Sequence, residues 1–153
     1  HPMPDERRER LRQAAATLPQ PADHRGRAAY RAALAAHRAT FLADEVRLRQ
    51  PTATLALFQH LAKRDGLDAM LAFHWGEVYR LRGWEDDRQK ALSTYARALA
   101  FAEAPVETHR SIGLVRRALG QRRGARFAFQ RYLAVAPDAA DQAIVQTYIA
   151  EAL

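Results

Sequence analysis

The sequence predicts an all-α protein built from antiparallel helix hairpins. Apolar residues recur at three- and four-residue steps, and proline or glycine separates the helical stretches. Two stretches also share one template of small and aromatic residues: the first contains Trp75, Gly76, Gly83, Ala91, Tyr95 and Ala98, and the second contains Ile112, Gly113, Gly120, Ala125, Phe129 and Pro137. Small residues let two helices approach closely while an aromatic ring fills the space beside them, so the template encodes a repeated hairpin.

Two helical stretches are expected at the N-terminal end. Residues 4–18 predict the first helix, because Asp5 and Glu6 lie in its opening turn and apolar residues recur on one face. A longer helical pattern follows from about residue 22 to residue 50. We expect it to bend near residues 39–40.

The next helix begins at Pro51, a helix-start signal, and ends at Gly66. With the preceding helix it forms a degenerate first unit that starts near Ala35. In the register of the later units, Leu42 occupies a position that is normally small, and Thr54 replaces the usual alanine.

The second unit covers residues 69–105. Its first helix is expected to end at Gly83, and its second helix to span roughly residues 87–104. The turn between them is three residues longer than the corresponding turn after Gly120, and Trp84 lies in this insertion.

The third unit runs from residue 106 to about residue 138, with Pro137 closing it. A last helix over residues 142–153 is expected to cover the open end of the array. The predicted organisation is therefore an N-terminal helical extension, residues 1–34, followed by a repeat domain with a capping helix, residues 35–153.

The shared template resembles the tetratricopeptide-repeat (TPR) family, strongly over residues 69–137 and weakly outside them. The resemblance implies an α-solenoid in which the first helix of each hairpin lines a concave groove. It also implies a scaffold or adaptor whose groove binds a peptide or a partner helix from another protein. The implied groove residues are Phe73, His74, Glu77, Arg80, Arg110, Leu114 and Arg117.

Two classes of TPR protein can be compared with this sequence. One class captures acidic chaperone tails through lysine, asparagine and arginine, but the matching positions here are Ala39, Ala43, His74, Glu107 and Ser111, so that clamp is missing. The chain is also similar to the TPR tails of bacterial envelope proteins. This similarity implies an alternative role as an accessory or chaperone module of a bacterial envelope or secretion system.

Composition limits several other classes. Hydrophobic residues make up 48% and charged residues 27% of the chain, which is typical of a folded globular protein. No stretch approaches the roughly 20 apolar residues of a transmembrane helix. The absence of cysteine excludes disulfides and thiol catalysis. We expect a periplasmic or envelope location if the N-terminus is trimmed and a cytoplasmic one otherwise; the oligomeric state is left open.

The charge is concentrated in the third unit. The formal net charge is +7, and we predict a basic patch formed by Arg116, Arg122, Arg123 and Arg126. Such a patch attracts phosphate or carboxylate groups, which makes an arginine-rich nucleic-acid-binding protein a further alternative. No nucleic-acid motif or stacking aromatic accompanies these arginines, and a solvated helix face has the same composition.

Nothing in the sequence argues for an enzyme. His74 and Glu77 lie three residues apart on one helix and could form an acid-base or ligand pair, but two groups are too few for a metal site and no third ligand is evident. The glycines around Gln121 belong to a turn between helices, since no strand precedes them. We therefore expect neither a metal nor another cofactor.

Overall fold

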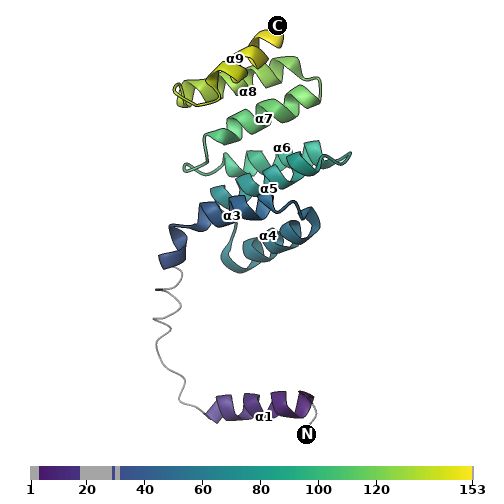
Figure 1. Ribbon diagram of the computed structural model, residues 1–153, viewed down its shortest axis with the longest axis vertical. Coiled ribbons are helices and arrows are strands. Elements are labelled where there is room, and N and C mark those ends of the chain that lie inside the picture. The colour runs from purple at the N-terminus through teal and green to yellow at the C-terminus, as the bar shows by residue number, and fades with distance from the viewer. Residues whose placement is uncertain (1–3, 18–28, 30–31, 153) are drawn as a thin grey trace. The chain divides into compact units, whose positions relative to one another are not determined.

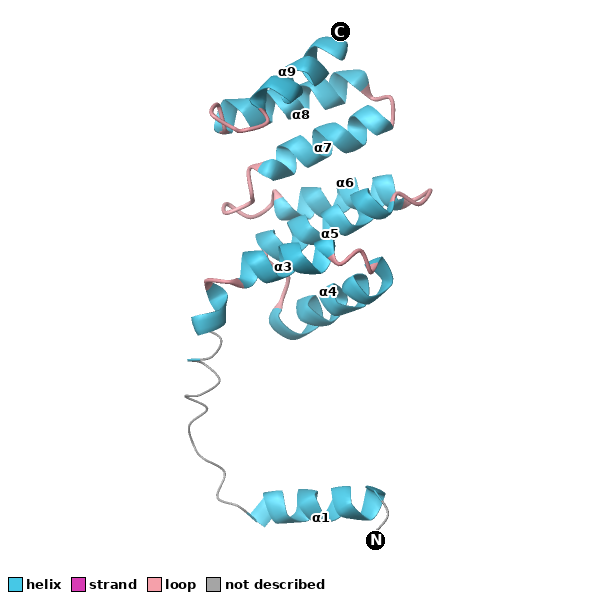
Figure 2. Cartoon of the chain, viewed as in Figure 1, coloured by secondary structure: helices cyan, strands magenta, loops and turns pink. Residues whose placement is uncertain are grey.

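The computed structural model describes residues 4–17, 29 and 32–152. These residues form helices joined by turns and include no strand, which confirms the all-α prediction (Figures 1 and 2). The chain divides into two compact units, His1–His37 and Arg38–Leu153. The division falls three residues beyond the boundary that the sequence predicted.

The first unit contains α1, Pro4–Thr17, as expected from its acidic opening turn. Residues 32–35 are also helical, but a turn at residues 36–37 follows, in which the His37 N–H donates to the Leu34 carbonyl at 3.0 Å. The prediction of one long helix reaching residue 50 is therefore wrong within the described residues, and residues 22–28 and 30–31 of that prediction lie outside them.

The second unit consists, within the described residues, of α3 (Arg38–Arg47), α4 (Pro51–Asp65), α5 (Ala69–Arg82), α6 (Asp87–Ala98), α7 (Glu107–Ala118), α8 (Arg122–Val135) and α9 (Gln142–Glu151). The most extensive contacts join α5 to α6 and α7 to α8. Further contacts join α4 to α5, α6 to α7 and α8 to α9, and α5 also contacts both α3 and α7. The hairpins thus pack against one another in chain order (Figure 1).

Most predicted helix boundaries in this unit hold, with one clear exception. Helix α6 ends at Ala98, six residues before the predicted end at residue 104. The Phe101 N–H donates to the Ala98 carbonyl at 3.1 Å, which is a turn contact rather than a helical one. Tyr95 and Ala98 are the last buried residues of this helix, so the apolar face that holds it in place ends there.

Three helix pairs share the same structural landmarks. After the first helix of each pair comes a residue with positive φ: Arg49 at 53°, Gly83 at 70° and Gly120 at 70°. The second helix of each pair then buries one aromatic ring completely, namely Phe58, Tyr95 and Phe129. Helix α6 begins four residues after its glycine, whereas α4 and α8 begin two residues after Arg49 and Gly120. The turn between α5 and α6 is therefore longer, as predicted, but by two residues instead of three.

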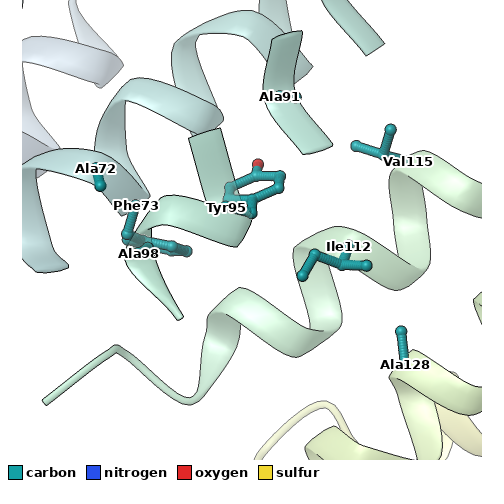
Figure 3. Packing of buried hydrophobic residues seen from close by; sticks show 8 residues of the cluster. All are labelled: Ala72, Phe73, Ala91, Tyr95, Ala98, Ile112, Val115 and Ala128. Atoms are coloured by element: carbon teal, nitrogen blue, oxygen red, sulfur yellow. The ribbon is translucent and has the colours of Figure 1, made fainter. Parts of the chain in front are cut away.

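The aromatic ring lies directly against a glycine in two of these pairs. A Cβ atom placed on Gly76 would come within 3 Å of three ring carbons of Tyr95, and one on Gly113 would do the same to Phe129. Figure 3 shows the apolar cluster that extends from Tyr95 to Ile112 and Val115 of α7. The template found in the sequence therefore marks the closest approach between paired helices.

The first pair is built differently because it has no glycine. Leu42 occupies the corresponding position and packs in one cluster with Phe58, Leu71 and Val78. A leucine side chain keeps two helices further apart than glycine does. Helices α3 and α4 accordingly make much less contact than the other two pairs.

We expect Gly76→Ala and Gly113→Ala to destabilise the protein. Overpacking costs about 1–3 kcal/mol, and the upper part of that range applies because the rings of Tyr95 and Phe129 are fully buried and cannot move aside. The higher helix propensity of alanine offsets at most about 1 kcal/mol of this loss in stability. Urea denaturation should therefore give lower free energies of unfolding for both variants.

Gly124→Ala is the matched control, since the atoms nearest to its added methyl belong to the flexible Arg116 side chain. This variant should be neutral or slightly more stable. Equal effects for all three substitutions would contradict the assigned helix contacts.

Candidate functional site

Polar side chains from α5 and α6 gather around the Glu77 carboxylate. The Arg80 guanidinium donates to it through Nε at 3.1 Å from Oε1 and through Nη2 at 2.5 Å from Oε2. The Tyr95 hydroxyl of α6 donates to Oε1 at 2.5 Å. Glu77 thus has only 9% of its surface exposed and both of its oxygens hydrogen-bonded.

The environment keeps Glu77 ionised. Burial alone would raise its pKa, but the hydrogen bond and the positive charge of Arg80 outweigh burial, so the pKa lies below the ordinary value. Burial and the neighbouring Glu77 raise the pKa of Tyr95, which therefore keeps its proton. The arrangement is a stable ion pair with a hydroxyl donor, and none of its groups is held near its own pKa at neutral pH.

His74 lies one turn before Glu77 on α5 and is also 9% exposed. Its ring packs edge-on against Phe73, with centroids 5.0 Å apart. Burial lowers its pKa, although Glu77 and Glu107 partly oppose this effect. Within the part of the chain that the structure describes, no group of three or more His, Asp or Glu side chains is placed to bind a metal ion.

A second polar cluster joins α7 to the start of α9. Arg110 donates through Nη1 to Oδ2 of Asp141 at 2.6 Å, and the Tyr132 hydroxyl of α8 donates to Oδ1 of the same carboxylate at 2.8 Å. Burial would raise the pKa of Asp141, but these hydrogen bonds lower it overall. One carboxylate therefore ties three helices together.

A third ion pair lies at the other end of the same two helices. Arg117 of α7 donates to Glu151 of α9 at 2.6 Å, and its guanidinium lies 4.4 Å from the ring centroid of Tyr148. About half of each charged side chain is exposed, 47% for Arg117 and 49% for Glu151. This pair is therefore much more accessible than the Glu77 cluster.

The structure alters the expected roles of the groove residues. Phe73 lies in the interior beside Tyr95 instead of facing a groove, with ring centroids 6.2 Å apart. Leu114 is half-buried against the cluster around Phe129. Neither side chain offers the open apolar contact that was expected of it, because each fills the space between adjacent helices.

The three groove arginines are all paired within the chain, to Glu77, Asp141 and Glu151. The sequence pointed to Glu77, but it gave no signal for Asp141 or Glu151. These two carboxylates lie 31 and 34 residues from their arginines and meet them only through the packing of α9.

The predicted basic patch lies at the junction of α7 and α8. Arg116 donates to the Gly124 carbonyl at 3.2 Å, while Arg122, Arg123 and Arg126 lie on the first two turns of α8. Among the described residues, none of these four arginines forms an ion pair with a carboxylate. Arg80, Arg110 and Arg117, by contrast, each pair with a carboxylate.

A scan against protein-family models, a search of curated proteins and a search of solved structures found no match to this chain. None of the helices in the described ranges has both the length and the hydropathy needed to cross a bilayer. Function therefore has to be inferred from the arrangement of the side chains.

We expect stability to fall as the pH is lowered from 7 to 5. The folded-state pKa values of His74 and His109 lie below the ordinary value of about 6.5, because His74 is buried and because partial burial and the positive charge of Arg131 act on His109. The unfolded chain therefore takes up protons first, and the stability present above that pH is lost as the pH falls through the folded-state values. Urea denaturation at several pH values measures this slope.

The double variant His74→Gln with His109→Gln should have a flatter dependence between pH 7 and pH 5. His60→Gln is the control, because that ring is exposed. An unchanged slope in the double variant would contradict the assignment.

Proposed function

We propose that the second compact unit, Arg38–Leu153, is a TPR-like solenoid and that the protein acts as a scaffold or adaptor. In this proposal a peptide or a partner helix binds along the face shared by α5 and α7. The observation that carries the proposal is the repeated pair geometry, in which a left-handed residue ends the first helix and the second helix buries one aromatic ring. The successive contacts of α3, α5 and α7 support a common face formed by first helices.

The charges on this face favour a partner that carries both signs. Arg80, Arg110 and Arg117 are each already paired with a carboxylate. A purely acidic segment would therefore have to displace Glu77, Asp141 or Glu151. A segment with alternating charges can instead exchange partners with each pair, which preserves the hydrogen bonds.

The three pairs differ in what it costs to rearrange them. Arg117 and Glu151 are about half exposed, and such surface pairs contribute about 0–1 kcal/mol. The Arg80–Glu77 pair is mostly buried, so removing one partner would leave an uncompensated charge in the interior. A partner is therefore expected to bind first through Arg117 and to leave the Glu77 cluster intact.

Arg117→Gln should reduce capture of partner proteins from native extract without a large loss of stability. Its matched control is Arg123→Gln, which removes the same charge from an exposed position on α8. Quantitative mass spectrometry of proteins retained on immobilised full-length chain provides the measurement. Equal retention by wild type and Arg117→Gln would contradict the proposed face, whereas Arg80 variants would not be informative because they also disturb Glu77.

A nucleic-acid-binding role is the second candidate, and one observation favours it. The basic patch of Arg116, Arg122, Arg123 and Arg126 has no ion-paired carboxylate among the described residues, so its charge is available to phosphates. Binding of this kind depends on the backbone of the nucleic acid and is expected to be insensitive to sequence.

Fluorescence anisotropy with labelled RNA and duplex DNA over a salt series tests this role. The logarithm of the binding constant should fall linearly with the logarithm of salt concentration, with a slope near −0.9 for each duplex phosphate neutralised. The triple variant Arg122→Gln, Arg123→Gln and Arg126→Gln should bind more weakly and with a shallower slope. Absence of binding at low salt would eliminate this candidate.

A further inference from the structure

A cavity of about 210 Å³ opens between the turn that joins α3 to α4 and the C-terminal end of α5. Its apolar walls come from Val46, Pro51, Val78 and Leu81, and its charged groups are Arg49 and Arg82. None of these residues belongs to the face proposed for partner binding. The cavity is therefore a separate feature of the second unit.

The helix-pair repeat explains why this space is open. In the α7–α8 pair, the residue before the left-handed glycine is Leu119, which packs against the core cluster that contains Val115. The corresponding residue in the α5–α6 pair is Arg82. A leucine at this position packs between adjacent helix pairs, whereas the arginine binds side chains of the α5–α6 turn instead.

Arg82 is held by side chains at the lengthened turn and is only 11% exposed. Its guanidinium donates to the buried Asp87 carboxylate through Nε at 2.8 Å and Nη2 at 2.7 Å. It also lies 4.0 Å from the ring centroid of Trp84. Because this bidentate pair neutralises its charge, Arg82 attracts an anionic ligand less strongly than an unpaired arginine does.

Arg49 is the available cation at this cavity. Among the described residues it has no carboxylate partner, and it adopts a φ of 53° in the turn. The equivalent residues of the other two pairs are Gly83 and Gly120, which adopt this conformation without strain. A side chain retained in the left-handed region costs about 1–2 kcal/mol, and such strain is characteristic of functional positions.

The size of the cavity limits the ligand. An apolar cavity of about 150 Å³ is enough to bind benzene, whereas drug-sized ligands occupy about 300–1,000 Å³. The observed volume therefore fits one aromatic ring or one branched aliphatic group, and it is too small for a nucleotide or a dinucleotide cofactor.

We propose that this cavity binds a small apolar carboxylic acid, with its aromatic or branched body between Val46, Val78 and Leu81 and its carboxylate accepting hydrogen bonds from Arg49. The apolar walls and the single unpaired guanidinium together match both parts of such a molecule. This proposal does not depend on the proposed scaffold function.

Isothermal titration calorimetry with 3-phenylpropanoate tests the proposal on the full-length chain. The uncharged 3-phenylpropanamide should bind at least tenfold more weakly, because it loses the charge-assisted hydrogen bonds to Arg49. Equal affinities for acid and amide, or no binding of the acid at millimolar concentration, would overturn the proposal.

The variant Arg49→Gly separates binding from folding. It should lose at least tenfold in affinity for the acid and yet melt at a higher temperature, because glycine relieves the left-handed strain. Leu81→Asp, at a half-exposed wall position, should also weaken binding through charge repulsion. Arg97→Gln, at an exposed position on α6, is the control and should bind like wild type; unchanged affinity in Arg49→Gly would refute the assigned role of this guanidinium.

Discussion

The closeness of paired helices in this protein depends on contact between a glycine and an aromatic ring. Where Gly76 meets Tyr95 and Gly113 meets Phe129, there is no room for even one methyl group. These contacts set the spacing within the α5–α6 and α7–α8 pairs, and the core clusters extend from them to the neighbouring helices. Where Leu42 replaces the glycine, the two helices make less contact. Helix spacing thus follows from the volume of one residue.

Hydrogen-bonded carboxylates add a second level of organisation, both within a hairpin and between α9 and the hairpin before it. Glu77 joins α5 to α6 through Tyr95, and Asp141 joins α7 and α8 to α9. The same bonds neutralise arginines that would otherwise form a strongly positive face. Arg80, Arg110 and Arg117 on α5 and α7 are therefore matched by carboxylates, whereas the basic patch at the α7–α8 junction and Arg49 in the α3–α4 turn have no ion-paired carboxylate among the described residues. Surface recognition and small-ligand binding are consequently assigned to different parts of the second unit.

The sequence predicted the helices and their glycine and aromatic contacts because these depend on local periodicity and on a template that occurs twice. It singled out Glu77 beside His74, whereas the partners of Glu77 in the structure are Arg80 and Tyr95. It did not reveal that Phe73 is buried, since helical spacing alone does not say which neighbour covers a face. The carboxylates of Asp141 and Glu151 gave no signal, because their arginines are distant in sequence. The cavity beside Arg49 is lined by residues from α3, α4 and α5 that only the packing of these helices brings together, and the positive φ of Arg49 is not evident from the sequence.

A double-mutant cycle on Gly113 and Phe129 tests the central contact most directly. This pair is preferable to Gly76 and Tyr95, because the Tyr95 hydroxyl also binds Glu77. If the ring is what excludes a side chain at residue 113, Gly113→Ala should cost at least about 1 kcal/mol less in a Phe129→Leu background than in wild type. Free energies of unfolding from urea denaturation supply the four values. Strict additivity of the two substitutions would contradict the account.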